Sequence, residues 1–593
     1  MKFKVVEVYK DNLGNQIACT VMTETKTKIK ESIAGIRIYF DTGHCINAYL
    51  TKNGTVHGKK GYRIPYITIK SATTYQNGFE VFSGHNLETL IANSGVMNKN
   101  SRDFVSGIIE YCKNQNLQGV LSISGLRGVG KTVGILQSIL HLLKTGVSPA
   151  DCTYITVSQV KKTTCKMLRC LLDTIQSKYI FIDEVTNISG LITDSAFLYD
   201  KYIMEGRRIV LSGTNSLVLV ESKTSALYHR TILMNVSFIN YNEAKRTLKC
   251  NLNEYVFMGG LYKADVFSEV EGMYNYVETA VVQNIVGTLS RNTAGTGLFD
   301  LKGIAEGKIR AIVFLSLYSV VFSSLNLNKD IAVTRLVNLF DISGTSLYTT
   351  DTLNEMVRRE FGLVLQSKVT EQELTHILNA MKEIGVLIEV RNIACSRESK
   401  KYYITNQCIV NVLIKDILTY LQRETGLSFK SKQKGMRGFR GLLFESLIMT
   451  HTVKYFERYS DYTVGYYRDD RNREIDMVVQ YTPEVGLLDD ESDYLLMEIK
   501  MTADKDTAIV KSEWINDAEV HNQIEEGRVL KNYILYSGAS GVFDGFDKRD
   551  EMSARYNEEK MDKISEKNYK VPLINVEYYL SNTTEFYRSV GFE

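Results

Sequence analysis

Eight consecutive residues, GLRGVGKT at 125–132, have the types and the spacing needed to hold phosphate groups. Glycines let the backbone wrap an anion with its N–H groups pointing inward, and the dipole of the following helix adds to the attraction. In a GxxxxGK[ST] loop, Lys131 is expected to reach the β- and γ-phosphates of ATP and Thr132 to ligate Mg²⁺. The residues that we expect to contact the nucleotide are Gly125, Arg127, Gly128, Val129, Gly130, Lys131, Thr132 and Val133.

Two carboxylates follow the apolar residues 179–182. Asp183 is expected at the carboxyl end of a strand, where it would hold Mg²⁺ through water. Glu184 is then the candidate general base that polarises the attacking water. The alternative is that both acids are only solvated residues at the end of a strand.

Two further polar positions fit a nucleotide site. The apolar run 209–212 ends in a Gly-Thr-Asn sequence, so either Thr214 or Asn215 can contact the γ-phosphate or its water, and the sequence does not separate the two. Arg230 could neutralise transition-state charge in a neighbouring subunit, which would require a homo-oligomer. A surface arginine at the end of a helix is an equally good explanation of Arg230.

A second group of charged residues lies near the C-terminus. Glu498 and Lys500 are two positions apart in a β-prone run, so they project from the same face of a strand. Asp476 lies in the preceding β-prone run and can join them across a hairpin. Two carboxylates can hold Mg²⁺, while the lysine orients or activates a hydrolytic water.

This D…ExK pattern resembles that of the PD-(D/E)XK nucleases, and Glu445 resembles the helix acid that helps to complete their metal sites. The resemblance implies a metal-dependent deoxyribonuclease with Glu445, Asp476 and Glu498 as metal ligands. Degenerate domains of this type bind DNA or a partner without cutting, so that alternative stays open. Basic residues precede the helix acid and could meet DNA phosphates, although a solvated charge run explains them equally well. They are Lys430, Lys432, Lys434, Arg437 and Arg440.

The nucleotide motifs together carry a second resemblance. GLRGVGKT, FIDE at 181–184, LSGTNS at 211–216 and YHRTILMNVSFINYNEA at 228–244 resemble the AAA+-related ATPases of bacteria and archaea that carry a C-terminal domain of restriction-endonuclease type. EYVFMGG at 254–260 resembles their lid motif. The resemblance extends over about residues 95–593 and implies ATP rather than GTP as the nucleotide.

The elements that must position these residues follow from hydrophobic periodicity. Short apolar strands at 119–124, 153–157, 179–182 and 209–212 alternate with helices, which indicates a doubly wound parallel sheet. We predict a multidomain α/β protein. Its segments are a small β-domain at 1–92, a P-loop ATPase domain of AAA+ type at 93–242, a helical lid at 243–368, a winged-helix-like segment at 369–428 and a restriction-endonuclease-like α/β domain at 429–593.

Two of these segments rest on local signals alone. In 1–92, β-prone runs alternate with turn signals such as Lys-Asn-Gly at 52–54, which are typical of hairpins. We expect this β-domain to dock an unknown protein partner or to mediate oligomerisation. In 369–428, an amphipathic helix at 370–384 precedes strands at 385–390 and 401–404, which suggests a winged helix with either a linker role or a DNA-binding role.

The bulk composition is that of a folded protein. Of the 593 residues 23% are charged, and the net charge of +3 neither requires nor excludes DNA as a partner. The nine cysteines include no CxxC pair, which suits a reducing compartment. The apolar stretch 311–322 is too short to span a bilayer and is expected to form a buried helix. The N-terminus shows no secretory core, so we expect a cytoplasmic protein.

The sequence therefore favours an ATP-binding and ATP-hydrolysing switch that uses Mg²⁺ and is coupled to a metal-dependent DNA nuclease. Defence against foreign DNA is the expected setting by analogy. The competing hypothesis is a nucleotide-switched regulatory or scaffold protein whose C-terminal domain binds DNA or a partner without cutting.

Overall fold

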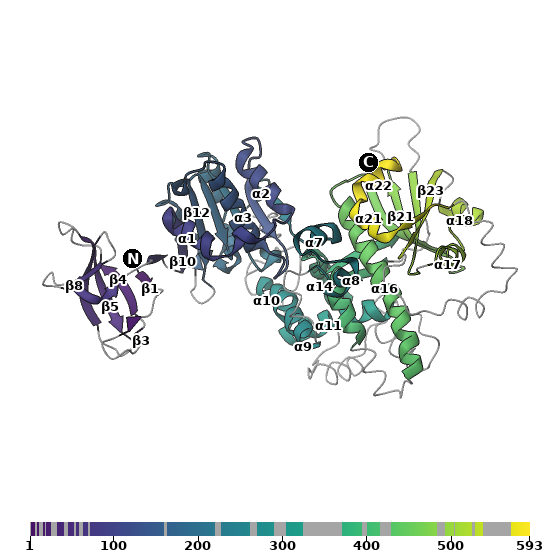
Figure 1. Ribbon diagram of the computed structural model, residues 1–593, viewed down its shortest axis with the longest axis horizontal. Helices are drawn as coiled ribbons and strands as arrows, with labels where there is room; N and C mark the ends of the chain where they lie inside the picture. The colour runs from purple at the N-terminus through teal and green to yellow at the C-terminus, as the bar shows by residue number, and fades with distance from the viewer. Residues whose placement is uncertain are drawn as a thin grey trace. The chain divides into compact units, whose positions relative to one another are not determined.

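A computed structural model of the chain divides into two compact units, one formed by Met1–Val236 and one that begins at Ser237. We describe each unit by itself (Figure 1). In the first 76 residues the structure describes only the backbone of the strands named below. Elsewhere it describes residues 78–158, 163–219, 227–260, 270–289, 304–323, 371–393, 400–415, 429–482, 493–502, 504–524, 528–537 and 571–592.

The first unit contains the predicted parallel sheet. Its parallel strands are β11 (Val120–Ser124), β12 (Cys152–Val157), β14 (Tyr179–Asp183), β16 (Arg208–Ser212) and β17 (Thr231–Asn235). They pair in the order β17-β11-β16-β14-β12. The carboxyl ends of parallel strands lie at one edge of a sheet, so the segments that follow β11, β14 and β16 meet there.

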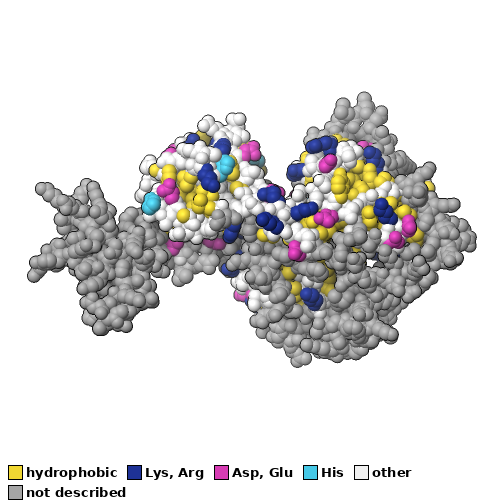
Figure 2. Space-filling view, in the orientation of Figure 1, with side chains coloured by type: hydrophobic (Ala, Val, Ile, Leu, Met, Phe, Trp, Pro, Cys, Tyr) yellow, Lys and Arg dark blue, Asp and Glu magenta, His cyan; other side chains and the backbone are white. Residues whose placement is uncertain are grey.

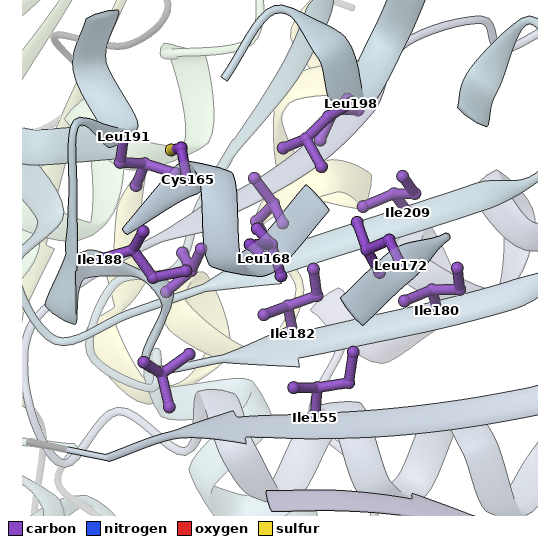
Figure 3. Packing of buried hydrophobic residues seen from close by; sticks show 14 of the residues in the cluster. Ile155, Cys165, Leu168, Leu172, Ile180, Ile182, Ile188, Leu191, Leu198 and Ile209 are labelled. Atoms are coloured by element: carbon purple, nitrogen blue, oxygen red, sulfur yellow. The ribbon is translucent and has the colours of Figure 1, made fainter. Parts of the chain in front are cut away.

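Apolar side chains on both partners hold the helices on this sheet. α4 (Cys165–Leu172) turns Leu168 and Leu172 toward Ile155, Ile180 and Ile182 of the strands, and all five side chains are buried (Figure 3). Burial of this kind contributes on the order of 1.5–3 kcal/mol per large aliphatic side chain. The strands are buried along nearly their whole length, as expected for a sheet with a helix on each face.

One strand joins the N-terminal strands to the parallel sheet. β10 (Phe79–Ser83) pairs antiparallel with β12 on one side and with β9 (Ala72–Gln76) on the other, so the domain boundary at residue 92 stays a prediction. The turn predicted at 52–54 lies outside the described residues. The other antiparallel strands of this region are β1 (Lys2–Val5), β4 (Cys19–Glu24), β5 (Ser32–Phe40), β6 (Cys45–Thr51), β7 (Thr55–Gly58) and β8 (Arg63–Thr68), with a separate pair formed by β2 (Tyr9–Lys10) and β3 (Gln16–Ile17).

Helices dominate the first part of the second unit. They are α7 (Tyr241–Thr247), α8 (Leu252–Met258), α9 (Val270–Tyr276), α10 (Gln283–Leu289) and α11 (Glu306–Ser323). α11 contains the apolar stretch predicted as a buried helix, and Phe314, Leu317 and Val321 are fully buried. Among the described helices none is both long and apolar enough to cross a bilayer. The predicted lid residues 324–368 lie outside the described part of the chain.

The rest of the second unit is built on a mixed sheet. Its strands are β18 (Leu387–Asn392), β19 (Lys400–Ile404), β20 (Tyr462–Arg468), β21 (Glu474–Tyr481), β22 (Asp493–Lys500), β23 (Arg528–Tyr536) and β24 (Leu573–Asn575). They pair in the order β19-β18-β20-β21-β22-β23-β24. The helices are α14 (Glu371–Glu383), α16 (Phe429–Phe456), α17 (Lys505–Lys511), α18 (Ala518–Ile524), α21 (Val576–Ser581) and α22 (Thr583–Ser589), of which α16 is the long helix beside the sheet in Figure 1.

This sheet corrects the prediction of a separate winged helix at 369–428. β18 and β19 form the predicted hairpin, but Arg391 and Asn392 of β18 pair in parallel with Gly465 and Tyr466 of β20. The two strands are therefore the edge of the C-terminal sheet rather than a wing. Helix, turn and hairpin look alike in sequence in both arrangements, because a sheet partner about 70 residues away leaves no local signal.

Candidate nucleotide site and candidate metal site

The phosphate-binding loop joins β11 to α3 (Lys131–Lys144), as predicted. Gly125, Gly128 and Gly130 all have positive φ, and Gly130 is the N-cap of α3. A Cβ added to Gly125 would lie 2.2 Å from the carbonyl oxygen of Val236, so only glycine fits at this position. Among the described residues, no side-chain hydrogen bond caps the N-terminus of α3, where the helix dipole would stabilise an anion. Arg127 and Thr132 are exposed, and Val133 is partly buried.

Lys131 is buried beneath this loop. Its Nζ donates to the carbonyl oxygens of Gly125 at 2.6 Å and of Leu126 at 2.9 Å. Burial lowers the pKa of Lys131 to about 8, although Asp183 and Glu184 act in the opposite direction. The neutral carbonyls compensate the ammonium only in part, so phosphate oxygens would be the better partners.

Asp183 is the centre of a hydrogen-bond network at the end of β14. Its Oδ2 accepts from the hydroxyls of Thr132 at 2.7 Å and of Tyr154 at 3.0 Å, while its Oδ1 accepts from the Ser212 hydroxyl. The two residues predicted to hold Mg²⁺, Thr132 and Asp183, are thus already adjacent. Their hydroxyl and carboxylate oxygens are the hard ligands that Mg²⁺ prefers, so the site fits the ion.

Glu184 takes a left-handed backbone conformation, with φ 56° and ψ 30°. Its Oε2 accepts from the backbone N–H of Thr214 at 3.3 Å and from the Thr214 hydroxyl at 2.9 Å. Such a conformation is strained for a residue other than glycine, and strained residues cluster at functional sites. Thr214 is therefore the partner of Glu184, whereas Asn215 is buried and donates its backbone N–H to Thr186. The catalytic role of Asn215 stays a prediction.

Two residues that the sequence reading missed hold the loop in place. The Ser216 hydroxyl accepts from Gly125 N at 2.7 Å and lies 2.7 Å from Gly125 O, and the Arg102 guanidinium donates to Val129 O at 2.5 Å. Ser216 lies inside the LSGTNS motif, so the sequence could have indicated that it belongs to the nucleotide site. Arg102 gave none, because only the tertiary structure brings it to the loop.

Arg230 lies at the opposite end of the parallel strands from the phosphate-binding loop. β17 runs parallel to β11 with Thr231 opposite Val120, so Arg230 precedes the amino end of β17 while the loop follows the carboxyl end of β11. Its Nη2 is 3.4 Å from Asp200 Oδ1, and its side chain is 39% exposed. Arg230 cannot reach the nucleotide of its own chain, and its role in a neighbouring subunit stays a prediction.

This role has a specific consequence. We expect Arg230→Ala to bind ATP normally but to lose turnover, because the transition-state charge in the neighbouring site is no longer neutralised. Mixing Arg230→Ala with Lys131→Ala should restore part of the steady-state ATPase rate, since some interfaces then combine an intact loop with an intact arginine. Arg169→Ala, which removes an exposed arginine of α4, is the control. Normal turnover by Arg230→Ala would leave Arg230 as a surface residue.

The C-terminal charged residues converge as the spacing indicates. Met477 pairs with Met497 in the antiparallel β21–β22 ladder, so Asp476 lies opposite Glu498. Asp476 Oδ2 accepts from Ile499 N at 2.7 Å and from Lys500 Nζ at 2.8 Å. The same ammonium also donates to Glu498 Oε2. One lysine thus bridges two carboxylates from adjacent strands.

The two carboxyl groups have opposite pKa shifts. Burial, reinforced by the charge of Asp476, raises the pKa of Glu498 well above its usual range. Burial also acts to raise the pKa of Asp476, but the charge of Lys500 and the hydrogen bonds that Asp476 accepts hold it below its usual value. A divalent cation between Asp476 and Glu498 would favour the ionised form of both carboxyl groups. The pair therefore suits Mg²⁺ and would supply two of its oxygen ligands.

A further set of side chains adjoins this pair. The Tyr403 hydroxyl of β19 donates to Glu445 Oε1 of α16 at 2.6 Å, and burial raises the pKa of Glu445. Lys401, also of β19, forms an ion pair with Glu474 of β21. The sequence did not single out Lys401 and Tyr403, because their strand was assigned to a wing, and Glu474 was missed because its partner Lys401 lies on that strand.

The acids do not form a closed metal cage. In the part of the chain that the structure describes, no three His, Cys, Asp or Glu side chains are grouped so that they could hold a metal ion. Glu445 is therefore not placed as a third ligand in this arrangement. Mg²⁺ commonly takes only one or two carboxylates and completes its shell with water and substrate phosphate, so Asp476 and Glu498 remain a sufficient pair.

Basic residues are not concentrated on the face shown in Figure 2. Over the described part of this face, Lys and Arg side chains alternate with Asp and Glu and with hydrophobic side chains. The predicted basic run at 430–440 belongs to the first turns of α16, but its side chains lie outside the described residues. Contact with DNA phosphates through that run stays a prediction.

Comparison with known families finds a match for two stretches of the chain. Residues 117–245 match the model of an AAA domain, and residues 440–541 match a domain of unknown function, DUF4143. No curated protein matches the sequence. The stretch that is similar to an AAA domain includes the loop, Asp183, Glu184 and Arg230.

Solved structures show only distant likeness. Among the similar chains are Saccharomyces cerevisiae Hsp104 in complex with casein, Aeropyrum pernix Orc1 in complex with DNA and AMPPCP-bound DnaA from Aquifex aeolicus, each 14% identical. They cover 44%, 55% and 47% of this chain and 52%, 96% and 86% of their own, with TM-scores of 0.23, 0.23 and 0.21. The match spans about half of the Hsp104 chain. Scores this low do not establish a shared overall fold.

Proposed function

We propose that this protein binds and hydrolyses ATP with Mg²⁺ and uses the cycle as a switch. The observation that carries the proposal is the Thr132–Asp183 hydrogen bond beside Lys131 and Glu184. At the carboxyl ends of the parallel strands, the phosphate-binding lysine, both candidate Mg²⁺ ligands and a candidate general base therefore lie together. These are the parts that phosphoryl transfer needs for positioning and for charge stabilisation.

The second part of the proposal is a metal-dependent DNA-cleaving site in the C-terminal sheet. Asp476 and Glu498 would hold the cation, which would polarise a phosphodiester and activate water. Lys500 already donates to both carboxylates, and once the cation takes its place between them the ammonium would orient that water. The support is the convergence of these three side chains from β21 and β22.

The switch and the cleaving site would be coupled. Bound γ-phosphate and Mg²⁺ hold segments that relax after hydrolysis, and a cleaving site under such control would spare the cell's own DNA until triggered. That property suits defence against foreign DNA. Arg230 further suggests a homo-oligomer, and the N-terminal strands suggest a docking module for a protein partner.

The competing function is DNA or partner binding without cleavage. It is favoured by the finding that the described residues include no three-acid group able to hold a metal ion. DNA cleavage by the purified chain, measured with Mg²⁺ or Mn²⁺ and again after chelation with EDTA, distinguishes the two. DNA binding without metal-dependent cleavage in any nucleotide state would establish the non-cutting function.

Glu184→Gln tests whether the two sites are coupled. The amide keeps the shape of the side chain but cannot act as a base, so the variant should bind Mg²⁺-ATP and remain in the ATP-bound state. We expect its DNA affinity or cleavage rate to differ from wild type by at least about fivefold, the low end of typical coupling. Both quantities are measured with and without ATP at fixed metal concentration. Identical values in all four conditions would mean two independent sites in one chain.

A further inference from the structure

The Asp183 carboxylate is held by donors on both of its oxygens. The hydroxyls of Thr132 and Tyr154 donate to Oδ2, at 2.7 Å and 3.0 Å. The Ser212 hydroxyl and the backbone N–H of Glu184 donate to Oδ1, the second of them at 3.0 Å. A carboxylate offers about four lone-pair positions, so these donors occupy all of them. Asp183 is only 3% exposed, and the donors therefore take the place of water around its charge.

The two hydroxyls on Oδ2 differ in their surroundings. Thr132 is exposed and belongs to the phosphate-binding loop, where its hydroxyl is expected to turn to Mg²⁺ when the ion binds. Tyr154 is 5% exposed and lies on β12, within the sheet. When Thr132 turns away, Oδ2 regains one lone pair while Tyr154 still holds the same oxygen atom.

The register of three strands explains why Tyr154 reaches this oxygen. β12 runs parallel to β14 with Thr156 opposite Asp183, so Tyr154, two positions earlier, projects from the same face of the sheet as Asp183. Phe82 of β10 lies directly opposite Tyr154 in the antiparallel ladder, and the centres of the two rings are 6.0 Å apart. The hydroxyl is thus presented by a ring that packs on the sheet, which fixes it more precisely than a loop would.

We propose that Tyr154 is a positioning residue for the Mg²⁺ of the nucleotide site. Its hydroxyl holds Oδ2 of Asp183 in place, so that the carboxylate can accept from a water molecule of the ion once the Thr132 hydroxyl has turned to the metal. Mg²⁺ usually keeps several of its waters, which makes such an indirect contact suitable. The inference rests on the proposed function, because it assumes that Thr132 and Asp183 bind Mg²⁺ together with ATP.

Tyr154→Phe tests this role, because it removes the hydroxyl and keeps the ring beside Phe82. Binding of a fluorescent, non-hydrolysable ATP analogue to the full chain is measured over a range of free Mg²⁺ concentrations and in EDTA. In wild type we expect Mg²⁺ to tighten binding. In Tyr154→Phe the Mg²⁺ concentration that gives half of this gain should rise at least about tenfold, the low end for loss of a partner of a metal ligand. The affinity in EDTA should stay at the wild-type value.

Two further variants serve as controls. Tyr179→Phe removes a tyrosine hydroxyl from the amino end of β14, the strand that carries Asp183 at its carboxyl end, so its Mg²⁺ dependence should match wild type. Asp183→Asn should lose most of the gain that Mg²⁺ gives. Thermal unfolding checks that each variant is folded, and Tyr154→Met, a second variant without the hydroxyl, replaces Tyr154→Phe if that variant unfolds.

The results separate the inference from the function on which it rests. Wild-type Mg²⁺ dependence in folded Tyr154→Phe, together with a loss in Asp183→Asn, would overturn the role of Tyr154 and leave the Mg²⁺ site standing. Equal weakening of nucleotide binding in Mg²⁺ and in EDTA would also overturn it, because a packing defect would then explain the effect. If Mg²⁺ did not tighten binding in wild type, or if Asp183→Asn kept the full gain, the proposed Mg²⁺ site and the inference would both fall.

Discussion

Lys131→Ala is expected to reduce ATP hydrolysis by at least about 10²–10³-fold, which is the usual cost of removing one preorganised donor to a developing charge. ATP binding should weaken as well, because a charge-assisted contact to the phosphates contributes about 1.5–3 kcal/mol. The structure sharpens this expectation. The Lys131 ammonium is buried against neutral carbonyl oxygens, so its charge is fully compensated only when an anion binds beside it. Steady-state hydrolysis and equilibrium binding of a fluorescent ATP analogue measure the two effects.

Lys144→Ala is the matched control for this experiment. Lys144 belongs to the last turn of the same helix, α3, and is exposed, so its loss should leave both ATP binding and turnover unchanged. A wild-type rate of hydrolysis by purified Lys131→Ala would show that the loop is not the site of catalysis. Weakened binding by both variants would point to a general effect on α3.

The second large effect concerns the C-terminal sheet. Asp476→Asn should lower metal-dependent DNA cleavage by about 10²-fold or more while the ATPase rate stays at the wild-type level. Asp476 faces Glu498, accepts from Ile499 N and binds Lys500, so the amide loses the charge needed for metal and lysine alike. Cleavage of labelled DNA in Mg²⁺ or Mn²⁺, read on a denaturing gel, gives the rate. The ATPase assay on the same preparation shows that the protein is folded.

Asp470→Asn provides the control, because Asp470 is an exposed carboxylate just before the same strand. The double variant Asp476→Asn with Lys500→Met should be no worse than Asp476→Asn alone, since both residues serve one metal and one water. Cleavage by that double variant at the wild-type rate would trace the activity to another site or to a contaminating nuclease.

The sequence alone determined the parts of both sites that depend on local spacing. A strand, a glycine-rich turn and a helix are encoded within about 20 residues, so local sequence is enough to assign Lys131 and Thr132 to the phosphate-binding loop. The end of a buried strand similarly marked Asp183 and Glu184. The period of two along a strand placed Glu498 and Lys500 on one face, and a hairpin partner placed Asp476 opposite them.

Tertiary structure decided which distant segments complete these sites. The order of the strands placed Tyr154 and Ser212 within hydrogen-bond distance of Asp183. The packing of the segment before α2 (Phe104–Lys113) brought Arg102 to the phosphate-binding loop. The pairing of β18 with β20 turned a predicted wing into a sheet edge and carried Lys401 to Glu474. Periodicity shows which face of an element is buried, but the choice between possible partners depends on burial and hydrogen bonding across long sequence separations, which no local window of sequence contains.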